Sequence, residues 1–129
     1  MRRCTLALAL AALALPAFAD SSGPAPIFAP HRIAAQDGEG IYRTVCQGCH
    51  MPDGRGAQGA ARYPSLVANQ NLAAGGYPVT IIVQGLRAMP PVGAMMDDAQ
   101  VAAVVNYIRT HFGNSYTDAV SAEDVKAVR

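Results

Sequence analysis

The sequence has little of what nucleic-acid-binding and membrane-spanning proteins carry. It contains no tryptophan, aromatic residues make up 6% of it, and no basic run is interleaved with aromatic side chains. The electrostatic footprint of nucleic-acid binding is therefore absent from the sequence. Beyond the first twenty residues the apolar stretches are short and amphipathic, so we expect no nucleic-acid partner and no membrane span in the mature chain.

The sequence also lacks any pattern that predicts a β-sheet. No segment alternates polar and apolar residues over the length of a strand, and no internal repeat is present. Large apolar residues are few, and domains of this size are often only marginally stable unless a disulfide, a metal or a cofactor stabilises them. We therefore expect an all-α fold of three or four helices whose interior is completed by another group.

The first residues, "MRRCTLALALAALALPAFAD", have the layout of a secretory signal peptide. An apolar run from Leu6 to Leu15 follows two arginines, and small residues around Ala19 form a cleavage site. The run is shorter than the ~20 apolar residues that span a bilayer, which disfavours a membrane anchor. We expect residues 1–19 to be removed, together with Cys4, and the mature protein to be exported to the periplasm.

The remaining chain divides into an arm and one domain. Residues 20–33 are rich in proline and show no helical period, which predicts an extended, flexible arm before a domain at 34–129. Apolar residues at helical spacing predict a first helix that ends at residues 46–50. Gly38 weakens this helix, and close approach by another element is the usual reason for such a glycine. Residues 78–85, from a proline to a glycine, predict a short second helix.

The helix with the clearest start and end patterns is expected between Asp97 and Gly113. Asp97 followed by Gln100 makes a capping box, and Gly113 stands just past the last apolar residue. The helical period places Arg109 opposite the apolar stripe, on the polar side. In residues 121–129, Ser121 with Asp124 three positions later repeats this helix-start pattern and predicts a short terminal helix.

Cys46, Cys49 and His50 form a Cys-x-x-Cys-His motif, "CQGCH". A thioredoxin-like site would need a preceding strand, and a zinc site would need further cysteines or histidines at suitable spacing. Two cysteines on one helical turn can each add across a vinyl group of a haem, while the next residue points its imidazole at the iron. This motif is a strong signal for c-type haem attachment, so we expect one covalently bound haem c.

The ligand on the other side of the iron decides what such a haem does. Met89 is favoured because the two prolines after it stiffen the backbone. Met95 and Met96 directly precede the cap of the last long helix, where a methionine more often packs against its helix, and they remain alternatives. A vacant position, or ligation by His31 or His111, also stays open.

Residues 36–113 resemble a class I c-type cytochrome. The matching stretches are "GEGIYRTVCQGCH", the loop with "YPSL", "RAMPP" and "VAAVVNYIRTHFGN". The resemblance implies a cytochrome c-like fold, with three to four helices wrapped around one covalently attached haem. It also implies that His50 and Met89 are the axial ligands and that the carbonyl of Pro64 accepts a hydrogen bond from His50 Nδ1.

A packing contact follows from the same resemblance. Gly38 and Tyr42 of the first helix are expected to pack across Val104 and Tyr107 of the last long helix. This crossing would bring together the two ends of the resembling region.

A His/Met-ligated iron has no free position for oxygen or peroxide and transfers one electron at a time. The sequence contains no acid/base pair and no partnered nucleophile that would mark an enzyme site. We expect a periplasmic electron carrier, similar to cytochromes that accept electrons from periplasmic dehydrogenases and pass them to another cytochrome or a terminal oxidase. The alternatives are a haem enzyme or sensor with a displaceable methionine, and a permanent cytochrome subunit of a dehydrogenase complex.

Overall fold

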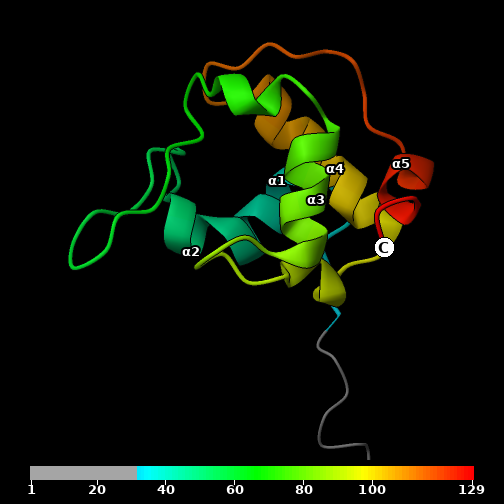
Figure 1. The fold of residues 1–129 in the computed structure, drawn as a ribbon, viewed down its shortest axis with the longest axis horizontal. Helices are drawn as coiled ribbons and strands as arrows, with labels where there is room; N and C mark the ends of the chain where they lie inside the picture. Colours follow the sequence, from blue (N-terminus) through cyan, green and yellow to red (C-terminus); the bar gives the residue numbers. More distant parts are fainter. Residues whose placement is uncertain (1–31) are drawn as a thin grey trace, which may run out of the picture.

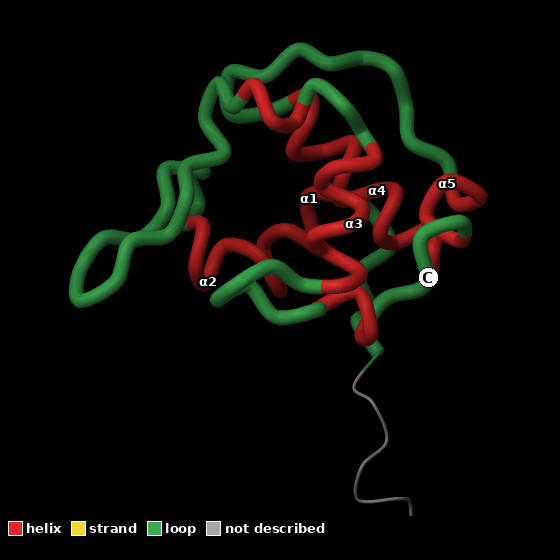
Figure 2. The backbone as a smooth tube through the Cα atoms, in the orientation of Figure 1, coloured by secondary structure: helices red, strands yellow, loops and turns green. Residues whose placement is uncertain are grey.

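The computed structural model describes residues 32–129, which form helices joined by turns and loops, with no strand in that part of the chain (Figure 1, Figure 2). The all-α fold expected from the sequence is confirmed. The expected signal peptide with its cleavage site at Ala19, the arm up to residue 31 and His31 itself lie outside the described residues. None of the helices that residues 32–129 form has the length and apolar character needed to span a bilayer.

The first helical segment continues from Gly38 to His50. It consists of α1 (Gly38–Ile41), a π-helix η1 (Tyr42–Cys46) and α2 (Gln47–His50). The Asp37 carboxylate begins the segment by accepting a hydrogen bond from the backbone N–H of Gly40 at 2.7 Å. The helix ends at the motif, as the sequence predicted. No residue pattern predicted the wide π turn, a feature that often occurs at functional sites.

The second helix, α3 (Gly76–Gln84), is the short helix expected at residues 78–85, and it starts slightly earlier. It ends at Gly85, whose φ of 77° lies in the left-handed region that favours glycine. Two 3-10 turns flank α3 in the chain, η2 (Gln70–Leu72) and η3 (Val92–Met95).

The last two helices are α4 (Asp98–Thr110) and α5 (Ala122–Lys126), and both begin with the predicted capping boxes. In α4, Asp97 Oδ1 accepts from the Gln100 N–H at 2.8 Å, and Gln100 Oε1 accepts from the Asp97 N–H at 3.0 Å. α4 ends at Thr110, and Phe112 and Gly113 then adopt positive φ values of 55° and 77°, which lie outside the right-handed helical region. The chain then turns back, so that α5 packs against α3 and α4 (Figure 1).

The core includes the crossing of α1 and α4. A Cβ on Gly38 would lie 2.6 Å from Tyr107 Cβ and would also overlap the carbonyl oxygen of Ala103, so only glycine fits there. The rings of Tyr42 and Tyr107 pack with their centroids 5.6 Å apart. The structure therefore contains the contacts of Gly38 and Tyr42 with Tyr107 that the resemblance implied, and it supplies the close approach expected for Gly38.

We expect Gly38→Ala to lower the free energy of unfolding by about 2 kcal/mol, because overpacking a tight contact costs about 1–3 kcal/mol. Gly76→Ala is the matched control, since Gly76 is also helical and a Cβ added there meets nothing within 4 Å. Denaturant unfolding followed by far-UV circular dichroism measures both variants. Equal unfolding free energies for Gly38→Ala and the parent would contradict the tight crossing.

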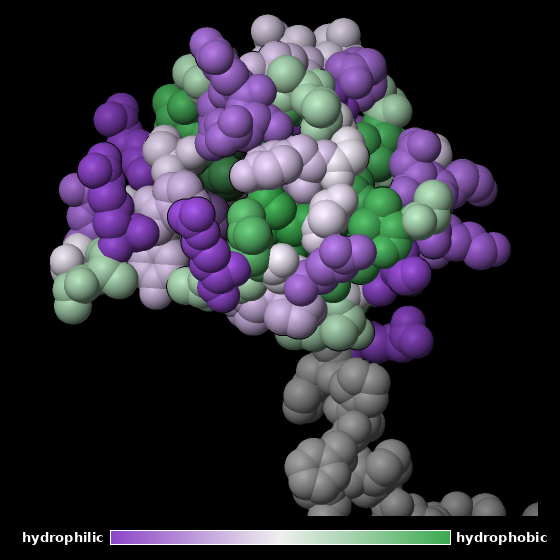
Figure 3. Space-filling view, viewed as in Figure 1, coloured by the Kyte–Doolittle hydropathy of each residue, from purple (hydrophilic) through white to green (hydrophobic). Residues whose placement is uncertain are grey.

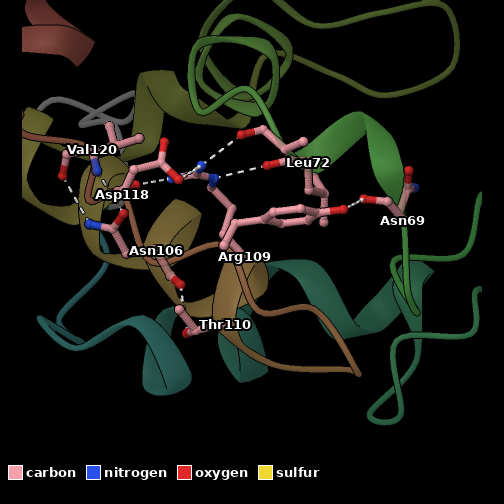
Figure 4. Close-up of polar contacts among 9 residues, drawn as sticks. Asn69, Leu72, Asn106, Arg109, Thr110, Asp118 and Val120 are labelled. Atoms are coloured by element: carbon pink, nitrogen blue, oxygen red, sulfur yellow. Dashed lines mark hydrogen bonds and ion pairs between the residues drawn. The ribbon is translucent and has the colours of Figure 1, made fainter.

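The burial of Arg109 was not predicted from the sequence. The helical period placed it on the polar side of α4, but its side chain is 0% exposed. The guanidinium donates to the carbonyl oxygens of Leu72 at 2.9 Å and Ala73 at 2.8 Å, and it pairs with an Asp118 carboxylate oxygen at 2.7 Å (Figure 4). The hydrogen bond from Arg109 in turn lowers the pKa of Asp118.

The burial of Arg109 follows from the segment that comes after α4. A buried charge is costly unless it is paired and hydrogen-bonded, and Arg109 meets both conditions. Its partners lie on η2, on the residue after it and on the chain leading to α5. The sequence did not predict this burial, because a helical period describes one helix and does not show which other segment covers its polar side.

Candidate functional site

The Cys-x-x-Cys-His motif occupies the last turns of the first helical segment. Cys46 closes η1, and Cys49 and His50 belong to α2. The two thiols are not joined in a disulfide; Cys49 is exposed and Cys46 is half-buried. Burial, and secondarily the neighbouring Cys49, raises the pKa of the Cys46 thiol to about 12. Two thiols separated by less than one turn are the donor set that attachment to a haem requires.

His50 is held in the state that a metal ligand needs. Its side chain is buried, and Nδ1 lies 3.1 Å from the carbonyl oxygen of Pro64. Because a carbonyl can only accept, Nδ1 carries the hydrogen of this bond and Nε2 keeps its lone pair in the neutral ring. Burial lowers the pKa of His50, and the bond to Pro64 opposes that shift. The contact also fixes the orientation of the ring, as carbonyl partners do for ligating histidines.

A loop of residues 51–64 brings Pro64 to His50. The backbone N–H of Gly56 donates to the His50 carbonyl at 3.0 Å, which folds the loop back onto α2. Gly56 has a φ of 79°, and a Cβ there would lie 3.1 Å from the Pro64 carbonyl oxygen and would overlap the carbonyl before it. Sequence reasoning missed Gly56; the glycine-rich composition of the loop was the only signal for it.

Tyr42 links the core to the chain reversal after His50. Met51 has a φ of 64°, which is uncommon for a residue other than glycine. The hydroxyl of Tyr42 donates to the Met51 carbonyl at 2.7 Å and stabilises this conformation. Burial raises the pKa of Tyr42 far above its usual range, so the hydroxyl stays protonated as a donor.

Met89 lies in a tight turn between α3 and η3. The Leu86 N–H donates to the Met89 carbonyl and the Met89 N–H donates to the Leu86 carbonyl, each at 3.0 Å. Arg87 within the turn has a φ of 53°. The Met89 side chain is half-buried and packs against the buried hydrophobic core of the domain.

The alternative ligands occupy different environments. Met96 is 4% exposed and belongs to the hydrophobic core, whereas Met95 is 37% exposed at the end of η3. His111 follows α4, is exposed, and stacks its ring on Tyr107 with the centroids 4.0 Å apart.

Part of the apolar surface of the protein is exposed. Among residues 32–129, five large apolar side chains are exposed: Tyr63, Val67, Tyr77, Leu86 and Met95. Apolar side chains also gather near the middle of the face that α3 occupies (Figure 3). A large contiguous apolar patch on the surface of a protein is typical of a ligand or partner site. Within residues 32–129, no three His, Cys, Asp or Glu side chains gather into a cluster that would hold a metal ion directly, so the motif has no additional zinc ligands in that part of the chain.

Comparison with known proteins identifies the family. The family described as "Cytochrome C oxidase, cbb3-type, subunit III" matches residues 33–108. The chain belongs to the cytochrome c family. Cytochrome c-552 of Thermus thermophilus is 32% identical over 117 residues, which cover 75% of this chain and 77% of that protein.

Other relatives are named as subunits of dehydrogenases. The chain is 32% identical over 108 residues to "Fructose dehydrogenase cytochrome subunit" of Gluconobacter japonicus, covering 72% of this chain and 22% of that protein. It is 32% identical over 109 residues to "Gluconate 2-dehydrogenase cytochrome c subunit" of Pantoea cypripedii, covering 74% of this chain and 24% of that protein. The chain therefore spans less than a quarter of the length of these two cytochrome subunits.

Membership of the family confirms two expectations from the sequence. The cofactor is a covalently bound c-type haem, and the chain is an electron-transfer protein of the cytochrome c type. The Cys-x-x-Cys-His motif at residues 46–50 lies within the matched region.

Proposed function

We propose that this chain is an exported one-electron carrier whose haem is attached through Cys46 and Cys49 and ligated by His50 and Met89. The observation that carries the proposal is the buried His50, whose Nδ1 lies 3.1 Å from the Pro64 carbonyl oxygen and whose Nε2 is free to bind iron. When bound, the haem supplies a one-electron couple between ferric and ferrous iron. The protein contributes the attachment, the orientation of His50 and the shielding of the iron from water.

Met89 is the ligand that we propose opposite His50. Met96 fills the core, where its sulfur is enclosed by protein, and Met95 is exposed beyond the turn. Met89 combines a half-buried side chain with a turn closed by two hydrogen bonds, which limits the positions its sulfur can take. A thioether ligand raises the reduction potential of a haem.

A dehydrogenase is the donor that we propose, and another cytochrome or a terminal oxidase is the acceptor. The relatives named as cytochrome subunits of fructose, gluconate and alcohol dehydrogenases support this class of donor. The signal-peptide layout of residues 1–19 supports a periplasmic location. The proline-rich composition of residues 20–33 supports an arm followed by one domain at 34–129. The exposed apolar side chains suit the small, transient interfaces of electron-transfer partners.

Intact-mass spectrometry of the purified protein tests export and attachment together. The expected mass is that of a chain beginning at Asp20 plus one haem that resists extraction with acidic acetone. A chain that retains its leader would contradict export, and a chain without the added haem mass would contradict attachment through Cys46 and Cys49.

A permanent cytochrome subunit of a dehydrogenase complex is the second candidate. It is favoured by the relatives that bear such names, although the chain covers less than a quarter of two of them. Gel filtration of a native extract, followed by haem absorbance, separates the two functions. A free carrier elutes at the size of the single chain, whereas a permanent subunit co-elutes with a large flavin, quinone or molybdenum protein.

A further inference from the structure

The turn that carries Met89 depends on its flanks for its position. Its backbone hydrogen bonds join Leu86 to Met89 and are internal to the turn. The chain enters the turn from α3 and leaves it towards η3, so these two elements determine where the Met89 sulfur lies. η3 is tied to the segment that precedes α1 by the Ile33 N–H, which donates to the Met95 carbonyl at 3.3 Å.

The residues after α5 reach both flanks of this turn. α5 packs on α3 and α4 through Val125, which is fully buried, and it lies beside the start of α4 (Figure 1). Gln84, the last residue of α3, donates from its Nε2 to the Val128 carbonyl at 3.1 Å. The entry side of the Met89 turn is thus held by the end of the described chain.

Arg129 makes the contacts on the exit side. Its guanidinium donates to the carbonyls of Gly93 at 3.2 Å and Met96 at 2.9 Å. Its Nε pairs with an Asp98 carboxylate oxygen at 2.5 Å, and the Arg129 side chain is 33% exposed. A planar guanidinium can hold three acceptors in one arrangement, which the single ammonium group of lysine cannot reproduce.

We propose that Arg129 is a positioning residue for Met89, and that together with Val128 it clamps the two flanks of the turn. The inference rests on the proposed ligation by Met89. An external ligand reaches the iron only in molecules whose turn has opened, so its apparent affinity is set by that open fraction. Loss of the clamp enlarges the open fraction without changing any residue of the turn or of the motif.

Titration of the ferric protein with imidazole tests this clamp. The readout is the loss of the weak far-red absorption band that an iron–sulfur bond produces. Arg129→Gln is expected to raise the apparent affinity for imidazole about tenfold, since hydrogen bonds to charged groups are among the stronger ones. Arg129→Lys keeps the charge but loses the planar guanidinium. Its apparent affinity for imidazole is therefore expected to lie between those of the parent and Arg129→Gln.

Two further variants make the result specific. Lys126→Gln removes the same charge from the same segment and should leave the titration unchanged, because Lys126 is exposed and takes part in none of the ion pairs within residues 32–129. Gln84→Ala removes the hydrogen bond to Val128 on the entry side of the turn and should also raise the apparent affinity for imidazole. If Arg129→Gln fails to fold, Gln84→Ala replaces it as the test.

The outcomes separate the clamp from the ligation on which it rests. A parent protein without the iron–sulfur band would overturn ligation by methionine and the clamp with it. A parent with the band but an unchanged affinity in Arg129→Gln would overturn the clamp alone. Equal changes in Arg129→Gln and Lys126→Gln would also overturn it, because they would show an effect of charge and not of position.

Discussion

Exchanging both Cys46 and Cys49 for alanine is expected to give a protein that carries no covalent haem and does not reach its native fold. The thiols are the only groups of the motif that can form thioethers, so attachment is lost completely. The domain has few large apolar residues, and several of them, including Leu86 at 48% exposure, are left on the surface. Domains of this size are only marginally stable without a disulfide, a metal or a cofactor. Losing the haem therefore removes the group that completes the interior.

Acid–acetone extraction followed by mass spectrometry measures attachment in this double variant, and far-UV circular dichroism measures folding. Gly48→Ala is the matched control within the motif, because a Cβ at Gly48 meets nothing within 4 Å. It should retain the haem and the helical signal. A well-folded double variant without haem would show that the chain fills its interior unaided.

Replacing Met89 with alanine is expected to open one axial position of the iron and to lower the reduction potential. The expected fall is a substantial part of the ~0.8 V range over which axial ligands set haem potentials. The ferrous variant should bind carbon monoxide, which the parent should not. Redox titration and the absorption spectrum with and without carbon monoxide measure the two effects.

Met95 and Met96 provide the controls for Met89. Met95→Ala should leave potential and spectrum nearly unchanged, because Met95 is 37% exposed beyond the turn. Met96→Ala should keep the ligation but destabilise the fold by about 2–5 kcal/mol, the usual cost of removing a buried methionine side chain. Loss of the iron–sulfur band in either variant, with the band intact in Met89→Ala, would reassign the ligand. A parent that binds carbon monoxide readily would favour a sensor or haem enzyme.

Several features of this protein followed from residues that are close together in the sequence. The capping boxes at Asp97 and Ser121 join groups three positions apart, so they can be predicted without knowing the fold. The attachment motif is equally local, since Cys46, Cys49 and His50 share one stretch of helix. The local start and stop signals, together with the helical period, predicted the second helix and the last two helices to within a few residues.

Other features were decided only by tertiary structure, because they join distant segments. The buried Arg109 bonds to Leu72, 37 positions away, and no helical period indicates such a partner. Gly56 could not be singled out until the loop was seen to pass next to the Pro64 carbonyl. The contact of Arg129 with Gly93 spans 36 positions. The sequence alone predicts which groups hold and ligate a haem, because they are local, while only the packing of distant segments decides where those groups lie relative to one another.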